Sequence, residues 1–182
     1  QTGPQKWYQK IGTYYQMQAT NYAQTKDSLL FTIETLDNLR NGIQHSLPIS
    51  TSFKLLKYIS LSPTLSLTDR MYFKTIRYTY NSELQQPDTV EVKRFANAFD
   101  YSASASMNTR IYGMFQYKRG PVAAIRHVMS PTIGYSYRPD FGESKYGYYK
   151  EVQTDSGGNK QTYSIFQTGV YGYPSNGKYG NL

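Results

Sequence analysis

Apolar and polar residues alternate with a period of two along most of this chain. In residues 43–55, 59–68 and 95–108 the odd positions are mostly apolar, as at Ile49 and Phe53, and the even positions are mostly small and polar. Successive side chains of a strand point to opposite faces of a sheet, whereas a helix repeats every 3.6 residues. The alternation therefore predicts an all-β chain whose sheet has one apolar face and one face rich in hydroxyl groups.

The pattern predicts six strands, separated alternately by long and short connections. The predicted strands are roughly residues 5–20, 43–55, 58–80, 94–108, 122–138 and 161–173. Long polar connections are expected near residues 21–42, 81–93 and 139–160, and shorter links near 55–58 and 108–120. Outer-membrane barrels have this alternation, with long loops outside the cell and short turns in the periplasm.

Strand length and the placement of charge favour a membrane barrel over a soluble β-sandwich, which also has six or seven strands. Several predicted strands exceed the usual five or six residues, and nearly all carboxylates fall in the long loops. Many of the 20 tyrosines lie near strand ends, where aromatic girdles occur. Because about eight strands is the lower limit for a bacterial barrel, residues 1–182 are predicted to form one antiparallel part of a larger transmembrane β-barrel. Its lipid-facing side chains should include Ile49, Phe53, Leu61, Leu65, Phe99, Ala103 and Ile133.

Composition argues against several classes of function. The chain has no cysteine and only two widely spaced histidines, His45 and His127, so no thiolate or histidine metal site is expected. It shows neither a nucleotide-binding fingerprint nor a triad or carboxylate pair, so we expect no enzyme and no cofactor. The net charge of +8 favours anionic partners. Nucleic acid is not expected among these partners, because a module that binds single-stranded nucleic acid would not need such long β-strands.

The candidate site residues lie on the even face, which would line the lumen. They are Lys10, Lys54, Arg70, Asp100, Arg126 and Arg138. Among hydroxyl groups, the cations could hold phosphates or sugars through charge-assisted hydrogen bonds. A solvated lumen wall with scattered charges is an equally good interpretation. The topology predicts two cationic levels, with Lys54 and Arg126 at the periplasmic mouth.

Three prolines fall inside predicted strands, where each removes a donor from the ladder. They are Pro48, Pro63 and Pro131. One interpretation makes them weak points that help a barrel to open sideways. The interpretation that we favour is a bulge or a local bend at each proline.

Residues 124–131 (AIRHVMSP) and 134–141 (GYSYRPDF) carry a family resemblance, supported by 6–8, 44–48, 111–115 and 145–149. In these stretches the chain resembles the lipopolysaccharide-assembly outer-membrane proteins, LptD or OstA-like, in the form found in Bacteroidota. The resemblance implies a large barrel in the outer membrane of a Gram-negative bacterium. It also implies lipopolysaccharide arriving over periplasmic bridge proteins, a plug lipoprotein (LptE-like) in the lumen, and a lateral seam towards the outer-membrane lipid.

Three functions remain open from the sequence. The first is a non-enzymatic translocon that inserts lipopolysaccharide into the outer leaflet. The second is a porin-like, nutrient-uptake or protein-secretion barrel, and the third is a soluble β-sandwich adhesin or binding module.

Overall fold

The computed structural model describes residues 6–29, 32–33, 35, 38–121 and 123–182. These residues are built from β-strands with three short 3₁₀ turns, η1 (Trp7–Lys10), η2 (Asp27–Leu29) and η3 (Ser144–Tyr146). The strands are β1 (Gly12–Thr13), β2 (Gln16–Tyr22), β3 (Arg40–Ser50), β4 (Phe53–Leu55), β5 (Ile59–Asn81), β6 (Gln86–Asn108), β7 (Ile111–Gln116), β8 (Ala124–Met129), β9 (Thr132–Arg138), β10 (Tyr149–Gln153), β11 (Lys160–Ser164) and β12 (Tyr179–Asn181). Among the described residues, no helix has the length and apolar character needed to cross a membrane.

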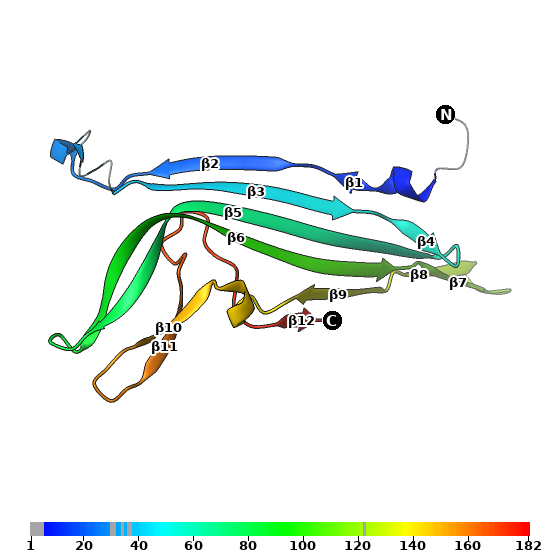
Figure 1. Ribbon diagram of the computed structural model, residues 1–182. Coiled ribbons are helices and arrows are strands. Elements are labelled where there is room, and N and C mark those ends of the chain that lie inside the picture. The colour runs from blue at the N-terminus through cyan, green and yellow to red at the C-terminus, as the bar shows by residue number, and fades with distance from the viewer. Residues whose placement is uncertain (1–5, 30–31, 34, 36–37, 122) are drawn as a thin grey trace.

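The main sheet is antiparallel and open, which confirms the predicted all-β fold class. Its order is β1-β3-β5-β6-β9-β12, with β2 also paired to β3 and β4 to β5 (Figure 1). Apolar residues lie opposite apolar residues on neighbouring strands: Ile49 lies opposite Leu65, which lies opposite Ala103. The other face carries rows of hydroxyls, such as Ser66 opposite Ser102. A register slip of one residue would place the apolar side chains of a strand on the hydroxyl face, so the alternation excludes such a slip.

β5 and β6 form a hairpin much longer than predicted. The expected polar loop at 81–93 is mostly strand, because residues 74–81 pair with 86–93 and only a tight turn joins them. Val90 and Val92 supply the β-branched side chains that favour a strand here. The register shifts between Tyr72 and Lys74, and beyond this bulge the hairpin bends away from the sheet (Figure 1).

Each of the three prolines lies where the chain or a neighbouring strand is interrupted. Pro48 lies opposite the gap between β1 and β2, and its carbonyl accepts a hydrogen bond from the Thr13 hydroxyl at 3.0 Å. Pro63 lies where β3 gives way to β4, and its carbonyl accepts from the Thr51 amide at 3.1 Å. Pro131 separates β8 from β9. The missing donors thus coincide with breaks in the pairing of neighbouring strands or of the chain itself, while the register stays continuous through Pro48 and Pro63.

The first and fifth predicted strands are interrupted. Residues 5–20 contain η1, β1 and the start of β2 rather than one strand, and residues 122–138 divide into β8 and β9. Residues 5 and 122, where these two predictions begin, lie outside the described residues. The short link expected at 108–120 contains β7, which pairs with β8 as a separate two-stranded sheet.

The sixth predicted strand, 161–173, is wrong beyond residue 164. β11 ends at Ser164, and a series of turns follows, including the bond from the Gly169 amide to the Phe166 carbonyl at 2.8 Å. Ile165 and Phe166 are adjacent and both buried, which a strand with one buried face cannot achieve. The strand that pairs with β9 is instead β12.

Residues 139–178 therefore form one long connection between two neighbouring strands, β9 and β12. It contains η3 and the β10–β11 hairpin, and it packs on the bent end of β5 and β6 (Figure 1). The buried cluster lies at this contact and consists of Tyr72, Ile76, Ala98, Val152, Tyr163, Ile165 and Phe166. The main core is thus not between two sheets but between one end of the sheet and this connection.

Candidate functional site

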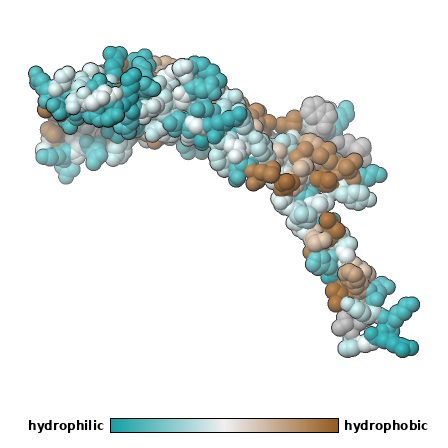
Figure 2. Space-filling view, turned by 90° about the horizontal axis from the view of Figure 1, so that it is seen from below, coloured by the Kyte–Doolittle hydropathy of each residue, from teal (hydrophilic) through white to brown (hydrophobic). Residues whose placement is uncertain are grey.

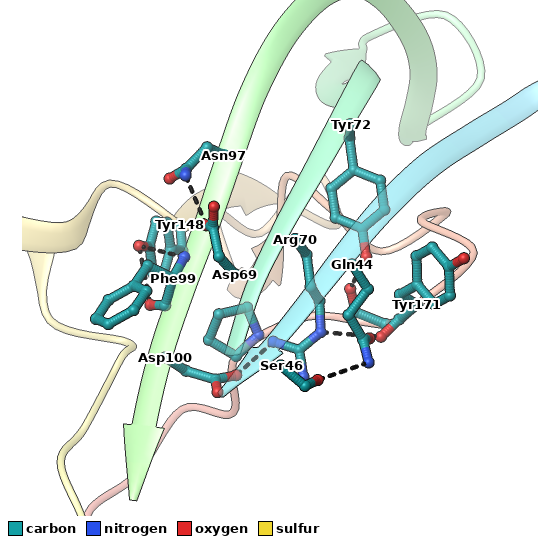
Figure 3. A network of polar contacts seen from close by, with 12 residues as sticks. Gln44, Ser46, Asp69, Arg70, Tyr72, Asn97, Phe99, Asp100, Tyr148 and Tyr171 are labelled. Atoms are coloured by element: carbon teal, nitrogen blue, oxygen red, sulfur yellow. Dashed lines mark hydrogen bonds and ion pairs between the residues drawn. The ribbon is translucent and has the colours of Figure 1, made fainter. Parts of the chain in front are cut away.

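Arg70 and Asp100 form an ion pair on the even face, beneath the connection. Arg70 Nη1 lies 2.5 Å from Asp100 Oδ2, and the two side chains are 16% and 20% exposed. Arg70 Nε also donates to the Tyr171 carbonyl at 3.1 Å (Figure 3). Alternation places both groups on one face, because Arg70 follows Ser66 and Thr68, and Asp100 precedes Ser102. The guanidinium therefore joins two strands to the connection.

Tyr72 brings the connection into close contact with β5. Its hydroxyl donates to the Gly172 carbonyl at 2.5 Å, and its ring is buried and lies 5.4 Å from the Phe166 ring. A Cβ at Gly169 would lie 2.7 Å from the Tyr72 ring. Gly42 on β3 likewise leaves room for residues 170 and 171. Because glycine has no side chain, these two positions let the backbone of the connection approach the sheet closely.

Two tyrosines of the connection bond to strands of the sheet. The Tyr171 hydroxyl lies 2.7 Å from the Thr20 hydroxyl of β2. The Tyr148 hydroxyl donates to the Phe99 carbonyl at 3.1 Å and accepts from the Phe99 amide at 2.9 Å. Phe99 lies beyond the part of β6 that pairs with β9, so Tyr148 satisfies backbone groups that no strand reaches there. Burial raises the pKa of the Tyr148 phenol, although the bond from Phe99 opposes that rise.

The other candidate site residues do not join this cluster. Lys10 is exposed and ends η1, outside any strand. Lys54 is exposed in β4, beside the β4–β5 turn, and the exposed Arg126 lies in β8, with its guanidinium 5.0 Å from the Tyr112 ring centre. Arg138 ends β9 and lies over the Tyr179 ring at 5.9 Å, while its Nε is buried without a hydrogen-bond partner.

The cations of the two predicted levels lie at opposite ends of the molecule and in different surroundings. Arg70 and Arg138 lie towards the connection, and Arg70 is neutralised by Asp100. Lys54 and Arg126 belong to separate elements at the opposite end of the molecule (Figure 1). Between the two levels the even face carries a strip of small hydroxyls, comprising Ser62, Thr64, Ser66, Ser102, Ser104, Ser106 and Ser136.

A polar row on the odd face was not predicted. The Tyr15 hydroxyl lies 2.6 Å from His45 Nδ1, His45 lies opposite Asp69 in the register, and Asn97 Nδ2 donates to Asp69 Oδ1 at 2.6 Å. This row crosses the apolar face near the connection. The sequence does contain a signal for it, because Asp69 has the same parity as Leu65 and Leu67.

The cluster around Arg70 is suited to holding the connection in place rather than to chemistry. Its groups are hydrogen-bonded to one another, and no nucleophile with an adjacent base occurs among them. Within the described part of the chain, no three histidine, cysteine or carboxylate side chains lie close enough to hold a metal ion. The geometry gives a covered end of the even face and an open strip of hydroxyls leading away from it.

A family model described as LptD protein matches residues 1–182. No curated protein and no solved structure matches the chain.

Proposed function

Since this chain belongs to the LptD protein family, which handles lipopolysaccharide in the outer membrane, we propose that it is the part of a translocon that inserts lipopolysaccharide into the outer leaflet. The family match over residues 1–182 carries this proposal. We further propose that it acts without catalysing a reaction. In this role it would work with a plug lipoprotein in the lumen and with periplasmic bridge proteins.

The two faces of the sheet support the proposal. The odd face is apolar from Leu61 to Leu67 and suits a lipid environment, whereas the even face offers hydroxyls and cations to a phosphorylated glycan. Outer-membrane barrels have long loops outside the cell and short turns in the periplasm. We therefore propose that the connection 139–178 lies at the outer end of the barrel and the β4–β5 turn at the periplasmic end. The covered end of the even face would then restrict free passage of solutes through the lumen.

Depletion of the protein in its native cell tests the proposal. We expect lipopolysaccharide to disappear from the cell surface, measured by labelling of intact cells, while the uptake of small nutrients persists. Retained surface lipopolysaccharide together with a defect in nutrient uptake or protein secretion would instead favour a pore or secretion barrel.

A further inference from the structure

β7 and β8, with their joining residues 117–121 and 123, form an arm that stands apart from the main sheet. Their only strand partners among the described residues are each other. Figure 2 shows a narrow projection at the end of the molecule where Figure 1 labels β7 and β8. The arm turns away from the body there, and polar and apolar surfaces are mixed along it.

Hydrogen bonds connect the base of the arm to the main sheet, whereas the rest of the arm is exposed. The Thr109 amide donates to the Pro131 carbonyl at 3.2 Å, and the Thr109 hydroxyl donates to the Tyr58 carbonyl at 3.0 Å. Beyond this base, nearly every residue of both strands is exposed. The Ser130–Pro131 break lets the hairpin change direction, since proline cannot continue the ladder.

Both faces of the arm present large apolar side chains to their surroundings. Phe115 is 64% exposed on one face and Met114 is 62% exposed on the other. The further exposed apolar side chains of the arm are Ile111, Tyr112, Tyr117, Ile125, Val128 and Met129. Large apolar side chains exposed at this density beside polar ones are typical of a binding surface.

The charge of the arm has a single sign. No aspartate or glutamate occurs from residue 101 to residue 139, whereas the arm and its base carry Arg110, Lys118, Arg119 and Arg126. Lys118 and Arg119 lie at the tip, and Arg126 lies over the Tyr112 ring, among apolar side chains. Cations beside exposed apolar groups are complementary to a molecule that joins phosphates to hydrocarbon.

We propose that this arm is a docking site for the phosphorylated lipid anchor of lipopolysaccharide. The cations of the tip and Arg126 bind its phosphates, and Phe115, Met114 and their neighbours contact its first methylene groups. The choice of lipopolysaccharide as the occupant rests on the proposed function, in which this end of the barrel faces the periplasm. The arm would then receive lipid before it reaches the hydroxyl strip of the even face.

The test uses the full chain in detergent micelles, labelled at one cysteine with a fluorophore that senses polarity. Because the chain has no cysteine, Ala124→Cys creates a single label on an exposed position of β8. The probes are purified lipopolysaccharide, phosphatidylglycerol and phosphatidylcholine in matched micelles. We expect the fluorescence emission to shift to the blue at a lower concentration of lipopolysaccharide than of phosphatidylglycerol. Phosphatidylcholine should cause no shift.

Two variants separate charge from apolar contact. The triple change Lys118→Gln, Arg119→Gln and Arg126→Gln should weaken lipopolysaccharide binding about tenfold or more at low salt, and added salt should narrow that difference. Met114→Ser with Phe115→Ser should weaken binding to a similar extent at all salt concentrations. A matched control, Arg77→Gln, Lys150→Gln and Lys160→Gln, removes the same charge from exposed positions at the other end of the chain and should bind as the unaltered protein does.

Three outcomes would overturn the proposal. They are equal binding by the arm variant and the control, equal response to phosphatidylglycerol, and a label already shielded before lipid is added, which would mean that protein covers the arm. The depletion experiment is independent of this one. Intact surface lipopolysaccharide after depletion, together with selective binding by the arm, would reject the proposed function and leave the docking site standing.

Discussion

At the scale of single residues, Arg70 joins the even face to the connection that covers one end of it. It neutralises Asp100 and also donates to the backbone of the connection at Tyr171. A half-buried carboxylate that loses its cation keeps the cost of its desolvation. Arg70→Gln should therefore lower the free energy of unfolding by about 2 kcal/mol, measured by urea titration in detergent. The double variant Arg70→Gln, Asp100→Asn should recover part of this loss, and strict additivity of the two single changes would show that the pair is not coupled.

Tyr148 gives the connection a dependence on alkaline pH. Burial raises its pKa above the ordinary value of about 10, because the charged phenolate is poorly solvated there, and the hydrogen bond from the Phe99 amide only partly opposes that rise. The stabilisation is therefore complete below about pH 10 and is lost as the pH rises through the raised pKa. The difference in tyrosinate absorbance between the unaltered chain and Tyr148→Phe should titrate with a midpoint above about 10. A midpoint at or below that value would contradict the burial of this phenol.

At the scale of elements, the alternation with a period of two predicted the long strands of the main sheet, which have one apolar face and one polar face. It could not predict residues 165–173, because that segment is stabilised by contacts with Tyr72 and Arg70, about a hundred residues earlier in the chain. It also missed residues 86–93, which were expected in a polar loop but pair with residues 74–81. Lys74 and Glu91 lie 3.5 Å apart across this hairpin. Alternation put Arg70 and Asp100 on the same face, but their contact depends on register, which the sequence pattern leaves open.

Gly169 tests how closely the connection must approach the sheet. Gly169→Ala would place a Cβ 2.7 Å from the Tyr72 ring and 3.0 Å from the Phe166 carbonyl, so the segment must shift. Overpacking of this kind costs about 1–3 kcal/mol. We expect faster proteolysis within residues 165–178 in the folded protein. Gly134→Ala in β9 is the control, because its Cβ would meet only ordinary contacts at 3.8 Å or more, and it should leave proteolysis unchanged. Equal protection in both variants would argue against a close contact at Gly169.

At the scale of the whole molecule, the two faces of the sheet must meet different surroundings at each depth of the membrane. A tilted strand crosses an apolar band of about 25 Å in roughly ten residues. On β5, Ile59–Asn81, we propose that this band runs from Leu61 to Met71. The polar row at His45 and Asp69 lies near the outer end of that stretch and opposite the arm. The side chains of β5 thus supply a depth scale, with Leu65 near the middle of the band.

Arginine substitutions along the odd positions of β5 test this orientation directly. Leu65→Arg should lower the free energy of unfolding from lipid bilayers by about 2–4 kcal/mol, since it brings a charge to the middle of the hydrocarbon. Leu61→Arg and Met71→Arg should cost only about 0–1 kcal/mol, because they lie near the two interfaces. Ser66→Arg, the neighbour of Leu65 on the even face, is the matched control and should cost little, since its side chain points towards the hydroxyl strip. The measurement is urea-dependent folding into vesicles. A Ser66 cost equal to that of Leu65, or a series with no maximum at Leu65, would mean that the odd face of this sheet does not face lipid.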